Sequence, residues 1–295
     1  MAGVDGEFGG VRFSNEEVVA FVERFDREMV QEGIQPNFRP IELTRKISKE
    51  FNIFTATGKS NNPEIQKLFD FHNSLYRPSD LAVGSIHSGL AFHLDLFFRV
   101  DVPRVYGTIN LKFLEHTDAT DAQLKRIFSY KNESEPFVSD IVDVFDIGGC
   151  LGGFYGFSQP RAEAMRLFRM SAFHSQSVVA TLSGIFDFKG AIQSALLSSE
   201  LSIKAALIEI GKGERFLKKE IGHNLEKAIP FLCAKAGYDQ GDLELNICEL
   251  PNFVSSRYDT KDWSRSEVSK IAKSSQRLLA TVSRKFSGKS FGTNL

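Results

Sequence analysis

The segment that most constrains the fold is an apolar stretch that carries one carboxylate and one ammonium. Residues 194–229 read SALLSSELSIKAALIEIGKGERFLKKEIGHNLEKAI, with Glu200 and Lys204 in the apolar first part. Charged groups on a buried helix cost free energy unless they are paired. Because positions i and i+4 share one helical face, Glu200 and Lys204 are predicted to pair there. The pair either lines a polar pocket for a nucleotide or phosphate, or is a structural ion pair that fixes the register of the helix.

The surrounding residues predict further helices. Apolar side chains at residues 165–186 follow helical spacing, and those at 268–286 form one stripe along a final helix. Four basic side chains fall nearly opposite that stripe, namely Lys270, Lys273, Arg277 and Arg284. Helices with short connections favour an antiparallel bundle. We therefore predict an all-α four-helix bundle over residues 161–288, followed by a flexible tail at 289–295.

The first half of the chain mixes helical and strand patterns. Helices are predicted at residues 14–33, 40–50 and 63–74 from their caps and spacing. Residues 92–102 alternate between two faces with a period of two, which is typical of a half-buried strand. Pro103 and Arg104 then indicate a turn. Residues 106–114 predict a second strand that completes an antiparallel hairpin.

Together these patterns predict an α+β fold with two domains. A mixed α/β-hairpin domain is expected at residues 1–158, and the boundary at 157–161 precedes the helical bundle. Residues 120–128 are expected to be helical, and 137–145 to form a strand or a short helix. The glycine-rich segment 148–156 lacks the spacing of a P-loop and of the dinucleotide-binding fingerprint. It therefore predicts a tight turn.

Composition excludes several classes of protein. The net charge of −1 provides no global basic field for nucleic acid, although residues 257–289 carry nine basic and three acidic side chains. Three scattered cysteines, Cys150, Cys233 and Cys248, make neither a disulfide framework nor a tetrahedral metal site. We expect no metal and no cofactor. Without a signal-peptide pattern or a run of about 18 apolar residues, the sequence predicts a cytoplasmic protein that does not contact membranes.

Three pieces of the C-terminal part are similar to the HEPN superfamily (higher eukaryotes and prokaryotes nucleotide-binding). SSELSIKAALIEIG resembles the family's second helix, and GHNLEKAI resembles the start of its third. PNFVSSRYDTKDW resembles the Arg-Tyr entry to its last helix. The resemblance covers about residues 161–288. The residues that carry it are Glu200, Lys204, His223, Leu225, Arg257 and Tyr258.

The resemblance implies a helical bundle that often dimerises and often works in toxin or phage-defence systems. A large subset of the family are metal-independent ribonucleases, which carry an Arg, four to six intervening residues and then a His at the entry to the last helix. Here Trp263 follows Arg257 after five intervening residues, and no His occurs beyond His223. Since acid–base cleavage of RNA favours a group that titrates near neutrality, the ribonuclease motif is degenerate.

We therefore expect a protein that binds RNA or a nucleotide, forms a homo-oligomer and has a protein partner. The residues predicted to contact the ligand are Arg257, Lys270, Lys273, Arg277, Glu200 and Lys204. Two alternatives remain open. One is a metal-independent endoribonuclease whose non-standard catalytic residues are drawn from Arg257, Tyr258 and His223. The other is a structural protein in which the bundle is an oligomerisation module.

Overall fold

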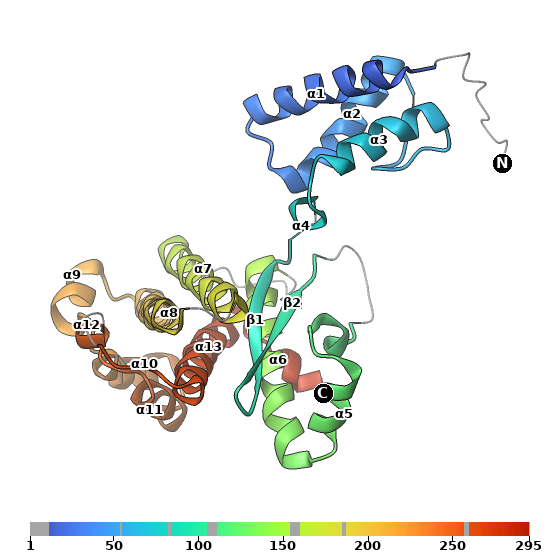
Figure 1. The fold of residues 1–295 in the computed structure, drawn as a ribbon. Helices are drawn as coiled ribbons and strands as arrows, with labels where there is room; N and C mark the ends of the chain where they lie inside the picture. The colour runs from blue at the N-terminus through green and yellow to red at the C-terminus, as the bar shows by residue number, and fades with distance from the viewer. Residues whose placement is uncertain are drawn as a thin grey trace. The chain divides into compact units, whose positions relative to one another are not determined.

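The chain forms two compact units, Met1–Gly84 and Ser85–Leu295 (Figure 1). The computed structural model describes residues 12–53, 55–81, 84–104, 111–153, 160–184, 187–256 and 260–294. Within these ranges the fold is mostly helical, with one two-stranded antiparallel sheet. The predicted α+β class and the largely helical C-terminal part are confirmed.

The first unit is built on three helices, which the sequence predicted within one or two residues: α1 (Asn15–Gln31), α2 (Arg39–Phe51) and α3 (Pro63–Ser74). Ser14 caps α1 through a capping box with Glu17. The apolar faces meet in a core that contains Val22 and Met29 of α1. Two short helices complete this unit, η1 (Pro36–Phe38) and α4 (Pro78–Leu81).

The hairpin lies earlier in the sequence than predicted. Strands β1 (His87–His93) and β2 (Leu96–Val102) pair antiparallel across a two-residue turn at Leu94 and Asp95. Leu94 has a φ of 57°, a conformation for which glycine or asparagine is the usual sequence signal. The apolar–polar alternation of residues 92–102 therefore continues through a turn that contains neither glycine nor asparagine, so the turn was not predicted. Of the predicted second strand, residues 106–110 lie outside the described residues, and η2 (Phe113–His116) occupies its end.

The glycine cluster is helical rather than a tight turn where it is described. Helix α6 (Lys131–Gly152) contains residues 137–145 and the first glycines, and Gly153 ends it with a φ of 66°. A Cβ on Gly148 would lie 2.7 Å from the Val102 methyl groups. Glycine is therefore needed so that α6 can lie close against β2. Residues 154–156 lie outside the described residues.

Replacing Gly148 with alanine is expected to lower the free energy of unfolding by about 1–3 kcal/mol, because the added methyl overpacks Val102. Helix propensity alone would favour alanine by roughly 0.5–1 kcal/mol, so the predicted sign depends on this contact. Gly184→Ala is the matched control, since nothing lies within 4 Å of its added Cβ. Urea unfolding of the two variants measures the difference. Equal stabilities of both variants would contradict the close approach.

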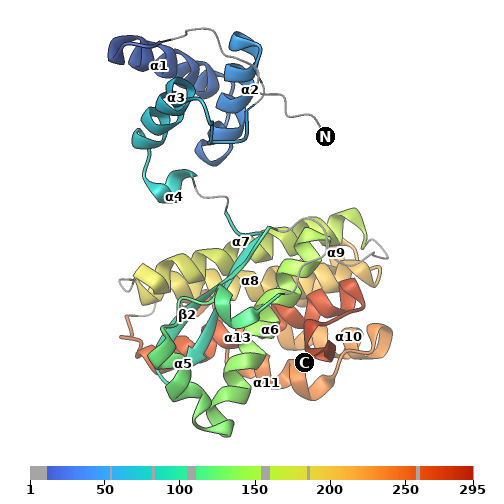
Figure 2. The same ribbon diagram turned by 90° about the vertical axis from the view of Figure 1, so that its right-hand side faces the viewer.

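Helix α8 (Phe188–Glu209) is the core helix of the second unit and packs against α7 (Ala162–Gly184) and α13 (Arg265–Ser287) (Figures 1 and 2). It is long and apolar enough to cross a membrane by composition, but 72% of its most apolar window is buried inside the protein. The remaining elements of this unit are α5 (Asp121–Phe128), α9 (Glu214–Phe216), η3 (Leu217–Ile221), η4 (Leu225–Ala228), α10 (Ile229–Ala236), α11 (Gln240–Cys248), α12 (Phe253–Ser256) and η5 (Phe291–Asn294).

The units divide at residues 84 and 85, whereas the sequence placed the boundary at 157–161. The hairpin and α6 pack with the C-terminal helices, and Gln276 of α13 bonds both backbone groups of Leu90 in β1 at 2.8 and 2.9 Å. The tail predicted as flexible at 289–295 is also held where it is described. Phe291 of η5 packs edge-on against Phe113 and Phe145.

Candidate functional site

Glu200 is the centre of a three-residue polar chain. Its Oε1 accepts a hydrogen bond from Lys204 Nζ at 2.6 Å, so the contact predicted along α8 is present. Its Oε2 lies 2.7 Å from Nδ1 of His223, a residue 23 positions later. The Glu200 side chain is only 9% exposed, and these two partners satisfy both of its carboxylate oxygens. The segments that carry Glu200, Lys204 and His223 therefore meet at one place.

An irregular stretch of backbone brings His223 to Glu200. After α8 and α9 the chain makes a π-helical turn, η3, and Gly222 then adopts a φ of 57° and a ψ of −117°. Such turns and backbone conformations often occur at functional sites. The imidazole of His223 stacks on Phe253 with ring centroids 5.0 Å apart and an interplanar angle of 19°. Half of the His223 side chain stays exposed.

These residues line a pocket of about 220 Å³. Its wall combines α8, η4, α11 and the segment that enters α12. The polar lining residues are Glu200, His223, Asn224, Glu226 and Asn252. This volume lies below the roughly 300–1,000 Å³ of sites for drug-sized ligands, so it suits one ring system of a larger molecule. We call it the Glu200 pocket.

The three segments quoted in the sequence analysis, at residues 198–211, 222–229 and 251–263, each contribute lining residues to the Glu200 pocket. Phe253 belongs to the third segment, and Gln193 Nε2 of α8 donates to Ser256 Oγ at the end of α12 at 3.0 Å. Arg257 and Tyr258 follow directly in the sequence but lie outside the described residues. The sequence analysis missed Glu226, Asn252 and Phe253 as lining residues. Their position in the two quoted segments was the only available signal.

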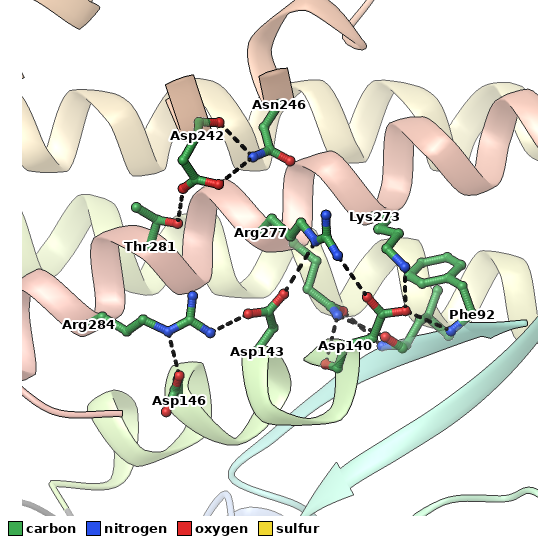
Figure 3. Close-up of polar contacts among 12 residues, drawn as sticks. Phe92, Asp140, Asp143, Asp146, Asp242, Asn246, Lys273, Arg277, Thr281 and Arg284 are labelled. Atoms are coloured by element: carbon green, nitrogen blue, oxygen red, sulfur yellow. Dashed lines mark hydrogen bonds and ion pairs between the residues drawn. The ribbon is translucent and has the colours of Figure 1, made fainter. Parts of the chain in front are cut away.

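Three basic residues of α13, Lys273, Arg277 and Arg284, lie elsewhere and face α6 (Figure 3). Lys273 Nζ donates to Asp140 at 2.9 Å, and the Arg277 guanidinium lies 3.9 Å from both Asp140 and Asp143. Of the basic side chains that were predicted to contact phosphate, Lys273 and Arg277 thus lie against buried carboxylates. Lys270 is exposed. No residue of α13 lines the Glu200 pocket.

The aspartates hold three elements together. Asp140 also accepts from the backbone N–H of Phe92 at 3.2 Å, which joins the hairpin to α6 and α13. Burial raises the pKa of Asp140 to about 7 and that of Asp143 to about 6, although nearby cations oppose the rise. Each of these carboxylates has one buried oxygen without a hydrogen bond within the described residues. The cluster is therefore a structural clamp with a pH-dependent charge.

The described residues contain no group of three or more His, Cys, Asp or Glu side chains placed to hold a metal ion. Comparison with known proteins gave no match to the chain among family models, curated proteins or solved structures.

Proposed function

We propose that the second unit binds RNA or a nucleotide, with a base in the Glu200 pocket. One observation carries the proposal. Three segments distant in sequence, each similar to a part of the HEPN family, converge on one small pocket beside a stacked His223–Phe253 pair. Proteins that bind single-stranded RNA stack bases on exposed aromatic and imidazole faces. The half-exposed ring of His223 offers such a face.

The charges around the pocket also favour a ligand whose base enters the pocket and whose phosphates stay outside it. Carboxylates line the pocket itself, whereas the exposed Lys227 follows the lining residue Glu226 directly in the sequence. An uncharged base therefore suits the interior, and phosphates suit the rim. Arg257 follows α12 in the sequence and is proposed to contact a phosphate. Lys270, Lys273 and Arg277 are not part of this proposal.

The resemblance to the HEPN family also suggests an assembly and a biological role for this protein. We propose a HEPN-like four-helix bundle in a cytoplasmic homo-oligomer that acts with a protein partner in a toxin or phage-defence system. The native mass of the purified protein, with its absorbance ratio at 260 and 280 nm, tests this. A large apolar interface without bound nucleic acid would favour a purely structural assembly protein instead.

His223→Ala is expected to weaken binding of single-stranded RNA about tenfold, because stacking on an aromatic face is worth about 1–3 kcal/mol per base. Fluorescence anisotropy with a labelled RNA measures the affinity across a salt series. His174→Ala is the matched control, since His174 lies on α7 and does not line the pocket. Equal affinities of both variants, with intact circular dichroism, would refute the proposed site.

A second candidate is a metal-independent ribonuclease. Its support is that Glu200 holds Nδ1 of His223, which directs acid–base chemistry to Nε2. As a base, Nε2 would take the proton of a ribose 2′-OH. That oxygen attacks phosphorus, the bond from phosphorus to the 5′-oxygen breaks, and the departing 5′-oxygen takes a proton from water, leaving a 2′,3′-cyclic phosphate. This candidate predicts that the wild type and the His174→Ala variant cleave labelled RNA in the presence of a chelator. The His223→Ala variant is expected not to cleave it. No cleavage by the wild type removes it.

A further inference from the structure

One carboxylate at the Glu200 pocket is available for a ligand. Both oxygens of Glu200 are engaged, by Lys204 and His223. Glu226 lines the same pocket and is exposed, and its carboxylate has no hydrogen bond or ion pair within the described part of the chain. Its backbone N–H donates to Asn224 Oδ1 at 3.1 Å, which caps η4 and fixes where this side chain begins. Glu226 is therefore an exposed acceptor at the pocket, on a backbone position that the cap of η4 fixes.

A carboxylate accepts hydrogen bonds and cannot donate them when ionised. Guanine carries two adjacent donors on its Watson–Crick edge, N1–H and the N2 amino group, and both can reach one carboxylate. Uracil places its N3–H between two carbonyl oxygens, which a carboxylate repels. Adenine offers one amino group beside an acceptor nitrogen. Among the described residues, no Lys or Arg lines the pocket to reverse this preference.

We propose that the Glu200 pocket selects guanine, with Glu226 accepting from N1–H and the N2 amino group while the base stacks on His223. The inference rests on the proposed function and adds its base specificity. Hydrogen bonds to a charged acceptor are stronger than neutral ones, and a donor pair on one carboxylate adds geometric specificity. Inosine keeps N1–H and lacks the N2 amino group, so it separates a two-bond contact from a one-bond contact.

The experiment uses the full chain and uridine RNAs that carry one guanosine, inosine, adenosine or cytidine at the central position. Guanosine is expected to bind about tenfold more tightly than inosine, and more tightly still than adenosine. Glu226→Gln is expected to remove this preference and to leave residual stacking affinity. Glu244→Gln is the matched control, because Glu244 is an exposed glutamate of α11 that does not line the Glu200 pocket.

The outcomes separate the inference from the proposed function. Equal affinities for the four RNAs, or a guanosine preference that survives Glu226→Gln, overturn the base specificity alone, provided that His223→Ala still weakens binding. Failure of every RNA to bind overturns the proposed function as well. Binding of free arginine that depends on Glu226, without any RNA binding, would assign the pocket to a cationic side chain and overturn both.

Discussion

Replacing Arg284 with methionine is expected to lower the free energy of unfolding of the second unit by about 3–5 kcal/mol. Arg284 donates through Nε to Asp146 Oδ2 at 2.6 Å and also donates to Asp143 (Figure 3). Both carboxylates are buried, so removal of the cation leaves negative charge in a poorly solvated place. Trp263 is the only tryptophan of the chain and lies in this unit, so its fluorescence can follow denaturant unfolding.

Two controls test whether the loss comes from unpaired charge. Lys285→Met removes the next cation, which is exposed, and is expected to cost less than about 1 kcal/mol. Adding Asp143→Asn and Asp146→Asn to Arg284→Met is expected to recover much of the stability, since the charges are then absent together. The loss should also shrink below neutral pH, because removal of the Arg284 cation raises the pKa of Asp143 further and the folded variant then takes up a proton before the folded wild type does. A loss below 1 kcal/mol at pH 7 would contradict the structural role of this clamp.

Local signals account for the part of the fold that the sequence predicted well. Ser14, Thr120 and Ser264 each form a capping box at the start of a helix, and a capping box involves only four consecutive residues. The Glu200–Lys204 contact is also local, since both residues lie on one face of α8. Such features follow from spacing alone and need no knowledge of what packs against the helix.

The errors arose where distant segments decide the structure. The alternation at residues 92–102 fits either one long strand or two short ones, and only the pairing of β1 with β2 places the turn at Leu94. Gly148 appeared as a turn residue because its contact is with Val102, 46 positions earlier. Lys273 and Arg277 of α13 were predicted to contact a ligand for the same reason, since their acidic partners lie on the distant helix α6.

The candidate site was predictable only in part. Glu200 and His223 were both singled out, but their contact depends on the π-helical turn before Gly222, for which the sequence offers no simple pattern. The aspartates of α6 carried a signal that was missed. Asp140, Asp143 and Asp146 recur every third residue within an apolar run, so they share one helical face with charged groups that need buried partners.

His87 is expected to make the second unit sensitive to acid. It lies in β1, its side chain is wholly buried, and neither ring nitrogen has a hydrogen-bond partner within the described residues. Burial lowers its pKa to about 3, against a slight opposing effect of Asp101. The unfolded chain therefore binds a proton first as the pH falls below about 6.5. This contribution to stability is complete above that pH and declines by about 1.4 kcal/mol for each pH unit down to about 3.

Asp140 and Asp143 act in the opposite direction, so the wild-type pH profile alone does not isolate His87. Their raised pKa values mean that the folded state takes up protons first, and their contribution to stability grows as the pH falls from about 7 towards 4. His87→Gln leaves these carboxylates in place and removes only the titrating ring. Between pH 7 and pH 5, the wild type is expected to lose about 2 kcal/mol relative to this variant in denaturant unfolding. The partly buried His174, replaced in the same way, should give a smaller difference. Parallel stability curves for the wild type and His87→Gln would mean that His87 reaches water or a partner in the folded state.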